Sequence, residues 1–211
     1  MFADRHDAGE QLAETLAERG VAADVVLAIP RGGLPVARPV ADRLDADLDL
    51  VAAKKLGLPG NPEMAIGAAA ADGSAWLDED AIDRYDVPDA YVESERERAA
   101  ETARQKLRTY RGDRPDPALA GADVVVVDDG VATGATARAC LRQVTESGAD
   151  QVVLAVPVGP AETVADLREE ADEVVVVDQP TSFGAVGAHY RDFSQVSDEE
   201  AMTYLDWADG D

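Results

Sequence analysis

Two carboxylates followed by a loop of glycines and threonines are the residues in this chain best suited to chemistry. Residues 124–127 are four valines, which is typical of a strand buried on both faces of a parallel sheet. Asp128 and Asp129 follow, and residues 130–136 then lead into a helical pattern of apolar residues. A strand, a loop and a helix in this order present free backbone N–H groups that can bind a phosphate. Carboxylates beside such a site suit sugar hydroxyls or a bridging metal.

The glycines and threonines of this loop favour phosphate binding over a plain polar turn. Gly130 and Gly134 let the backbone approach an anion closely, and Thr133 and Thr136 can add hydroxyl donors. A buried strand with a polar turn would explain the valines, but not the order of acids, glycines and threonines. The P-loop and Gly-x-Gly-x-x-Gly patterns are both absent at this position.

This stretch resembles the PRPP signature of the type I phosphoribosyltransferases, where PRPP is 5-phosphoribosyl-1-pyrophosphate. The resemblance implies that the two acids hold the ribose 2′- and 3′-hydroxyls and that the loop wraps the 5′-phosphate. The ribose and 5′-phosphate site would then contain Asp128, Asp129, Gly130, Val131, Ala132, Thr133, Gly134, Ala135 and Thr136.

A second turn with glycines follows the apolar strand expected over residues 24–29. Arg31, Gly32 and Gly33 come directly after Pro30 and precede a helical stretch over residues 34–44. The turn resembles the pyrophosphate-binding loop of the same family, which often holds an unusual peptide conformation. A solvent-exposed turn is the simpler interpretation, and Pro39 should kink this helix or shift its start.

Two adjacent lysines follow a third strand, expected over residues 48–53. Lys54 and Lys55 have no obvious role in solubility in so acidic a chain, so we interpret them as phosphate contacts. A surface ion pair is the alternative. The segment resembles the lead into the mobile catalytic loop of adenine-type enzymes, with an irregular hairpin over residues 66–76. Glu63 and Asp72 are candidate loop acids.

The tail resembles the C-terminal segment of purine-type members of the family. That resemblance implies that Phe183 stacks on the base, that Arg191 contacts pyrophosphate and that Asp192 lies on the metal side. A core aromatic beside a helix N-terminus is the alternative interpretation. We expect His189 to be structural.

Strands alternate with helices along the chain, which predicts an α/β fold with a doubly wound, mostly parallel central sheet flanked by helices. Ligands in such sheets bind at the carboxyl ends of the strands, where all three suspected phosphate segments begin. We expect one domain over residues 1–211, with a small hood from residues 56–90 and 178–211. Asp7 and Glu10 resemble a capping box for a first helix, and residues 91–110 predict a long helix with a charged outer face.

Composition limits the partners. The formal net charge is −24, and Lys54, Lys55 and Lys106 are the three lysines. Such a surface repels nucleic acid and anionic membranes, so we expect neither as a partner. The balance is similar to that of proteins from salt-accumulating halophiles. The lone Cys140, expected to be a packed thiol, and the lack of an apolar signal segment fit a cytoplasmic location.

The resemblance implies a phosphoribosyltransferase that uses PRPP with Mg²⁺, transfers the phosphoribosyl group to a nitrogen acceptor such as a nucleobase and releases pyrophosphate. Arg31, Lys55, Asp128 and Asp129 would be its catalytic residues. Ala132 stands where hypoxanthine-guanine enzymes have a general base, so the acceptor is open. A non-catalytic PRPP sensor and a flavodoxin-like domain with incidental glycines are the alternatives. The resemblance also suggests a homodimer.

Overall fold

Five parallel strands form the central sheet of the computed structural model, which describes residues 1–205. Their order across the sheet is β2-β1-β6-β7-β8. The strands are β1 (Val25–Ala28), β2 (Asp47–Leu50), β6 (Asp123–Val127), β7 (Gln151–Val158) and β8 (Glu173–Asp178). All five point the same way, so their carboxyl ends share one edge. The predicted parallel sheet is confirmed.

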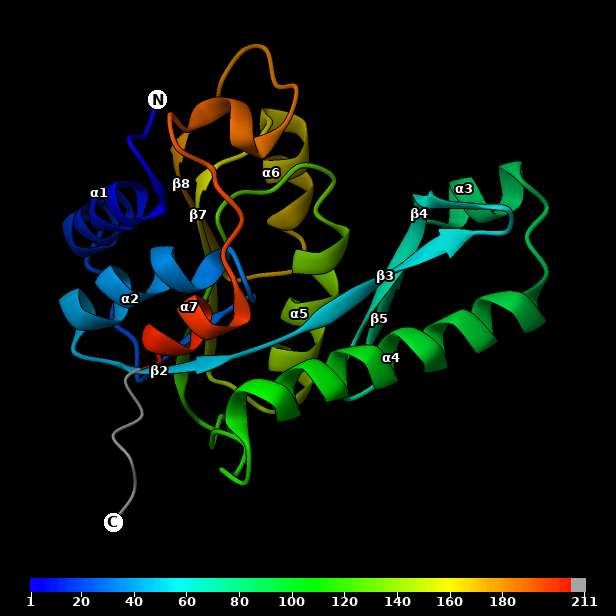
Figure 1. The fold of residues 1–211 in the computed structure, drawn as a ribbon, viewed down its shortest axis with the longest axis horizontal. Coiled ribbons are helices and arrows are strands. Elements are labelled where there is room, and N and C mark those ends of the chain that lie inside the picture. Colours follow the sequence, from blue (N-terminus) through cyan, green and yellow to red (C-terminus); the bar gives the residue numbers. More distant parts are fainter. Residues whose placement is uncertain (206–211) are drawn as a thin grey trace.

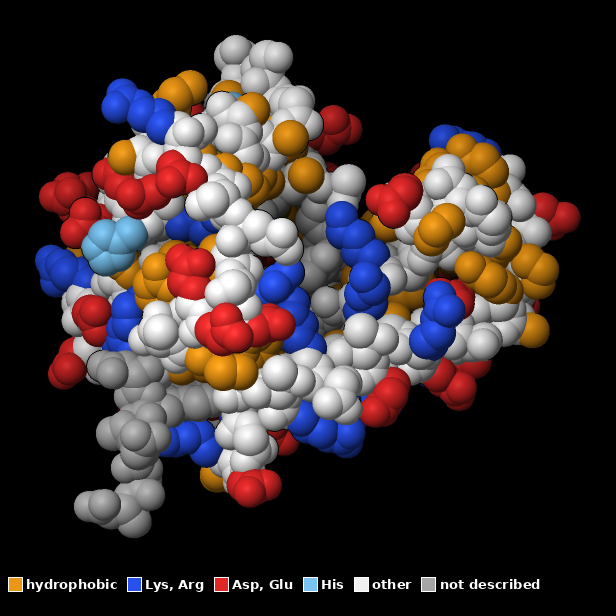
Figure 2. Space-filling model, viewed as in Figure 1, with side chains coloured by type: hydrophobic (Ala, Val, Ile, Leu, Met, Phe, Trp, Pro, Cys, Tyr) orange, Lys and Arg blue, Asp and Glu red, His pale blue; other side chains and the backbone are white. Residues whose placement is uncertain are grey.

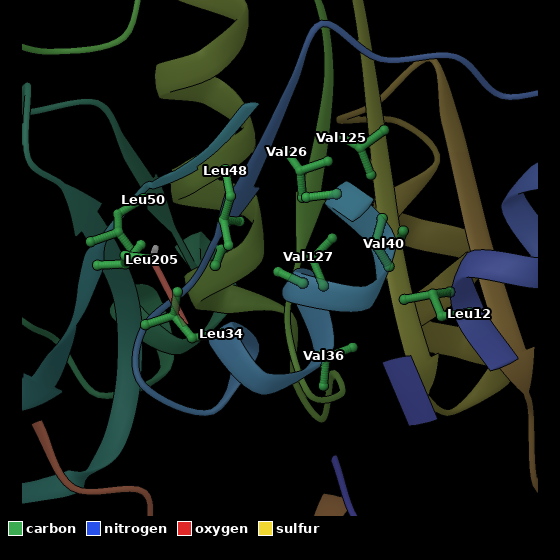
Figure 3. Close-up of a cluster of buried hydrophobic side chains, with 14 of the residues drawn as sticks. Leu12, Val26, Leu34, Val36, Val40, Leu48, Leu50, Val125, Val127 and Leu205 are labelled. Atoms are coloured by element: carbon green, nitrogen blue, oxygen red, sulfur yellow. The ribbon is translucent and has the colours of Figure 1, made fainter. Parts of the chain in front are cut away.

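Helices cover both faces of this sheet, as the doubly wound prediction requires (Figure 1). One face packs against α1 (Arg5–Glu18) and α2 (Gly33–Leu44), and the other against α5 (Ala135–Glu146) and α6 (Ala161–Leu167). Successive valines of β6 alternate between the two cores: Val125 and Val127 face α1 and α2, and Val124 and Val126 face α5 and α6. Figure 3 shows the first of these cores, where Leu12 and Val40 lie beside Val125 and Val127.

A second, antiparallel sheet and a long helix project from the core as the hood (Figure 1). The hood contains β3 (Ala53–Leu58), β4 (Asn61–Ala70), β5 (Ala75–Leu77), α3 (Glu79–Arg84) and α4 (Asp89–Arg111). Its own apolar core includes Leu56, Ile66, Ile82 and Val92. The opposite face of its sheet meets α5 through alanines, among them Ala68 and Ala139. The hood is therefore fastened to the core along α5.

The strand predicted over residues 48–53 is two strands in different sheets. β2 ends at Leu50, and β3 begins at Ala53 and pairs with β4. Val51 and Ala52, both buried, carry the chain from one sheet to the other. A continuous apolar run cannot indicate such a change of sheet, and the hood accordingly begins three residues earlier than predicted.

Arg111 joins the two ends of the hood excursion. Its side chain is buried, and it donates to Oδ1 of Asp49 and to the carbonyl of Leu50, with Nη2 2.8 and 2.9 Å from these atoms. Asp49 and Leu50 lie at the exit from the core, and Arg111 ends α4, which returns to it. The long predicted helix is confirmed, including the ion pairs of Glu95 with Arg98 and Glu101 with Arg104 on its outer face.

The predicted capping box at the first helix is wrong. Asp4 is the N-cap, and its carboxylate accepts from the N–H of Asp7 at 2.9 Å. The helix starts two residues before Asp7 because the extended backbone of Asp4 sets its first turn. α2 continues through Pro39. Among residues 1–205, no helix is long and apolar enough to cross a membrane.

The last described part of the chain runs from the end of β8 through the 3₁₀ helix η1 (Val186–His189) to α7 (Asp198–Thr203). It lies against the N-terminus, where Phe2 and Tyr190 form a parallel bridge and their rings are 5.3 Å apart. The N-terminus and this segment thus come together at the edge of the sheet where the strands end (Figure 1). The expected hood contribution of residues 206–211 lies outside the described residues.

Candidate functional site

A cavity of about 180 Å³ lies at the carboxyl end of β6, between the loop that follows this strand and the hood. Its wall is formed by Lys55, Asp128, Gly130, Val131, Ala132, Thr133, Gly134, Ala135, Thr136, Ala137 and Val186. The loop after β6 and a lysine of the hood therefore share one cavity. A larger cavity, of about 590 Å³, lies between the end of α4 and α5 and contains none of these residues.

The loop after β6 is held open by contacts to its neighbours. Gly134, with φ of 75°, precedes α5 in the left-handed conformation that favours glycine. The hydroxyl of Thr163 donates to the carbonyl of Ala132 at 2.8 Å, and the N–H of Val131 donates to the carbonyl of Val158 at 3.0 Å. These contacts fix the loop from outside the cavity, and the N-terminal amides of α5 are left for an anion.

Asp128 lines the cavity, Asp129 follows it in the chain, and both side chains are largely shielded from solvent. The N–H of Asp129 donates to Oδ1 of Asp128 at 2.8 Å. Burial, together with the neighbouring charge of Asp129, raises the pKa of Asp128 well above its ordinary value. Burial also raises the pKa of Asp129, although a hydrogen bond from Arg5 acts in the opposite direction. Hydroxyl donors or a nearby positive charge would stabilise the charged form of both carboxylates.

The turn of Arg31, Gly32 and Gly33 packs directly on these carboxylates. A Cβ on Gly32 would lie 2.0 Å from Oδ2 of Asp129, so only glycine fits there. The peptide bond between Pro30 and Arg31 is cis. Arg31 places Nη1 3.6 Å from Oδ1 of Asp198 in α7. The two turns that sequence analysis singled out, after β1 and after β6, are therefore neighbours at the sheet edge.

Lys54 and Lys55 lie within β3 rather than beyond a strand end, and both are exposed. Lys55 lines the cavity, and the charge of Lys54 acts on Lys106 of α4. Figure 2 shows basic side chains gathered at the hollow between core and hood. The structure thus brings Lys55 to the loop after β6, whereas Lys54 does not line this cavity.

Two further residues at this site were missed from sequence. Arg5 of α1 reaches Asp129, with Nε 2.8 Å from Oδ2. Lys106 of α4 donates from Nζ to the carbonyl of Pro30 at 2.5 Å. No motif of the sequence gives Lys106 a role in the site. Its position three residues after Ala103 and four before Tyr110, both on the apolar stripe, is the signal that it faces inward.

The tail contributes Val186 to the cavity wall, but Phe183, Arg191 and Asp192 do not line it. The Phe183 ring stacks on His189 at 5.3 Å, and Asp192 accepts from the N–H of Ser194 at 2.9 Å. Arg191 is exposed and attaches through its backbone N–H to the carbonyl of Phe2. The roles suggested for Phe183, Arg191 and Asp192 stay predictions. Of the loop acids, Asp72 binds Ser74 at the turn before β5, and Glu63 is exposed.

The carboxylate pair suits a divalent cation that arrives with a phosphorylated substrate. Among residues 1–205, no group of three or more His, Cys, Asp or Glu side chains could hold a metal by itself. Mg²⁺ is usually bound by one or two carboxylates together with substrate phosphates, so Asp128 and Asp129 fit this mode.

Comparison with known proteins gives the family. The model of the phosphoribosyl transferase domain matches residues 4–191. Rv0571c and MT0597 from two strains of Mycobacterium tuberculosis, which are named phosphoribosyl transferases provisionally, are each 46% identical to the chain over 212 residues. The chain belongs to the phosphoribosyltransferase family. All of it is covered by these matches, but it spans 48% of the length of each relative.

Solved structures agree with this assignment at the level of the fold. The structure of TT1426 from Thermus thermophilus is 47% identical, covers 97% of both chains and superposes with a TM-score of 0.82. AQ2163 from Aquifex aeolicus, 13% identical over 95% of this chain and 85% of its own, has a TM-score of 0.54 and shows a likeness of fold alone. The predicted family and fold are both confirmed.

Proposed function

We propose that the protein transfers the phosphoribosyl group of PRPP to a nitrogen acceptor and releases pyrophosphate. The observation that supports this most is the shared cavity, which places Lys55 of the hood opposite the loop from Gly130 to Ala137. A phosphate can bind at the loop, Asp128 can accept from sugar hydroxyls beside it, and Lys55 adds a positive charge from the hood side. These groups suit a sugar that carries phosphate at one end and pyrophosphate at the other.

In this proposal each part of PRPP has its own residues. The amides and threonine hydroxyls of residues 130–136 bind the 5′-phosphate, and Asp128 and Asp129 accept from the ribose hydroxyls. Arg31, Gly32, Gly33, Lys54 and Lys55 surround the pyrophosphate, with Arg191 as a further predicted contact. Mg²⁺, when bound with PRPP, would neutralise part of the pyrophosphate charge, and Asp128 and Asp129 are the carboxylates that would help to hold it.

The chemistry exchanges one bond at C1′ for another. The bond from C1′ to the pyrophosphate oxygen breaks, its electron pair leaves with pyrophosphate, and a nitrogen lone pair forms the new bond. The acceptor proton passes to solvent, since Ala132 provides no base in the loop. The protein contributes positioning and charge: the cations stabilise the leaving group, and the buried carboxylates stabilise positive charge that develops on the ribose.

Partners and location follow from the same proposal. The substrates are small molecules, and the charge of −24 opposes binding to nucleic acid or anionic membranes. A homodimer, a cytoplasmic location and a salt-rich cell interior stay predictions. Because the relatives are about twice as long, the proposed activity is that of the domain described by this chain.

Pyrophosphate release from PRPP and Mg²⁺ with a panel of nucleobases, measured in molar KCl, tests the proposal. We expect release with at least one base. We also expect Lys55→Met to weaken PRPP binding about tenfold or more, because it removes a charge-assisted contact. Arg84→Met, on the exposed side of α3, is the matched control. PRPP binding without release for any base would favour a sensor, and no binding would contradict both functions.

A further inference from the structure

Lys106 of α4 and Lys54 of β3 are close enough for the charge of Lys54 to act on the Lys106 ammonium. Lys55, the third lysine of this very acidic chain, lines the cavity. Arg31 and Asp128 also act on the Lys106 ammonium. Lys106 is therefore part of the surroundings of the proposed pyrophosphate site, although family resemblance gave it no role.

The direct contact of Lys106 is to the backbone of the turn after β1. Its Nζ donates to the carbonyl of Pro30, the residue before Arg31, and Pro30 itself is buried. The hydrogen bond joins α4 of the hood to the turn that packs on Asp129. It also counters the partial negative charge of a carbonyl oxygen beside the place where an anion is proposed to bind.

The charges around this ammonium are close to balanced without a ligand. Arg31 and Lys54 oppose its charge, and Asp128 and Asp198 favour it. Burial, together with the charge of Arg31, lowers the pKa of Lys106. A neutral donor such as glutamine could hold the Pro30 carbonyl without placing a charge there. The positive charge of Lys106 is available to an anion that binds beside Arg31, and a purely structural bond to the carbonyl does not require it.

We propose that Lys106 is a positioning residue of the pyrophosphate site, which fixes the turn of residues 31–33 through the Pro30 carbonyl and adds its charge beside Arg31. This inference rests on the proposed function, since pyrophosphate is the anion that the turn would receive. It gives α4, predicted from sequence as a long helix with a charged outer face, a part in substrate binding.

Three substitutions separate the two parts of this role. Lys106→Met removes both donor and charge, Lys106→Gln keeps a donor, and Lys106→Arg keeps both. Arg108→Met, two residues along the same helix and exposed, is the control. Calorimetry measures the binding of inorganic pyrophosphate with Mg²⁺, and pyrophosphate release gives KM and kcat for PRPP. Amide hydrogen exchange over residues 31–34 measures how firmly the turn is held.

We expect Lys106→Met to weaken pyrophosphate binding about tenfold or more and to raise KM for PRPP more than it lowers kcat. The amide hydrogens of residues 31–34 should also exchange faster in this variant. Lys106→Gln should restore slow exchange but not affinity, and Lys106→Arg should restore both in part. If Lys106→Met does not fold, the pyrophosphate affinities of Lys106→Gln and Lys106→Arg are compared instead, and a higher affinity of Lys106→Arg would support the role of the charge.

Equal pyrophosphate affinity in wild type and Lys106→Met, or in the Gln and Arg variants, would overturn the inference and leave the proposed function standing. A wild-type protein that binds neither PRPP nor pyrophosphate would contradict the proposed function and this inference together. A lower melting temperature of Lys106→Met, with unchanged pyrophosphate affinity and unchanged KM for PRPP, would show that Lys106 is only structural.

Discussion

Arg5 and Asp129 form a shielded ion pair that joins the first helix to the edge of the sheet across 124 positions of sequence. The guanidinium Nε lies 2.8 Å from Oδ2, and the two side chains are 12% and 15% exposed. The same guanidinium lies 3.8 Å from the centre of the Phe193 ring and donates to the carbonyl of Ser194. Arg5 thereby holds the carboxylate, the N-terminal helix and the tail in one cluster.

Replacing Arg5 with methionine should lower the free energy of unfolding by about 2–4 kcal/mol, because a shielded carboxylate loses its charged partner. Urea denaturation measures this change. Arg98→Met is the control: its guanidinium is 74% exposed and pairs with Glu95, so a loss below about 1 kcal/mol is expected. A similar loss in both variants would show that Arg5 is no more than a surface charge.

The buried pair of carboxylates should contribute less to the stability of the fold as pH rises. The folded-state pKa of Asp128 is raised above 3.8 by burial and by Asp129, so between these values the folded chain binds more protons than the unfolded chain. The contribution of Asp128 to the free energy of unfolding therefore decreases as pH rises through this window and levels off above the raised pKa.

Asp128→Asn should remove this dependence, since the amide keeps the oxygen that accepts from the N–H of Asp129. Relative to wild type, the variant should gain stability as pH rises from 3.8 and be more stable at neutral pH. Denaturation midpoints over this range, compared with Asp83→Asn on exposed α3, measure the effect. A difference between variant and wild type that does not change with pH would refute it.

Gly32 should be intolerant of even one methyl group. A Cβ there would meet Oδ2 of Asp129 at 2.0 Å, so Gly32→Ala must displace the carboxylate or the turn. We expect a loss of about 1–3 kcal/mol in stability and a weaker affinity for PRPP. Gly184→Ala is the matched control, because nothing lies within 4 Å of its Cβ. Thermal melting measures the loss of stability, and calorimetry measures the affinity for PRPP. Equal melting temperatures and equal affinities of the two variants would disprove the close packing at Gly32.

Cys140 should be unreactive in the folded protein. The thiol has no exposed surface, and burial raises its pKa, so little thiolate is available to a reagent. A colourimetric thiol reagent should modify the native chain at least about a thousandfold more slowly than the chain in denaturant. Fast modification under native conditions would mean that α5 opens away from the sheet.

Much of the sheet could be predicted because its strands are marked by valine runs. Residues 124–127 and 174–177 are continuous β-branched stretches, and each lies in a buried parallel strand. The turn residues after β1 and β6 could be found for a related reason, since carboxyl ends of parallel strands meet at one edge. Periodicity reports which side of an element is apolar, and here this was sufficient.

Contacts between distant segments were beyond that kind of reasoning. The partner of Asp129 is 124 residues away, and the passage of the chain to a second sheet at Val51 leaves no mark in an apolar run. Asp4 rather than Asp7 caps the first helix because the backbone before the helix decides the start, and either acid could have served. Lys106 had a readable signal, its place on the apolar stripe, which the surrounding charges obscured.

The closure of the hood by Arg111 has a consequence for how such proteins diversify. Everything between Ala53 and Arg111 leaves and rejoins the sheet at neighbouring points, so this segment resembles an exchangeable cassette with its own apolar interior. Grafting another sequence between these points would keep the turns after β1 and β6 in place and would replace the hood side of the cavity, including Lys55. The side of α4 that packs on the main core, with Ala103, Leu107 and Tyr110, would have to be kept in any such insert.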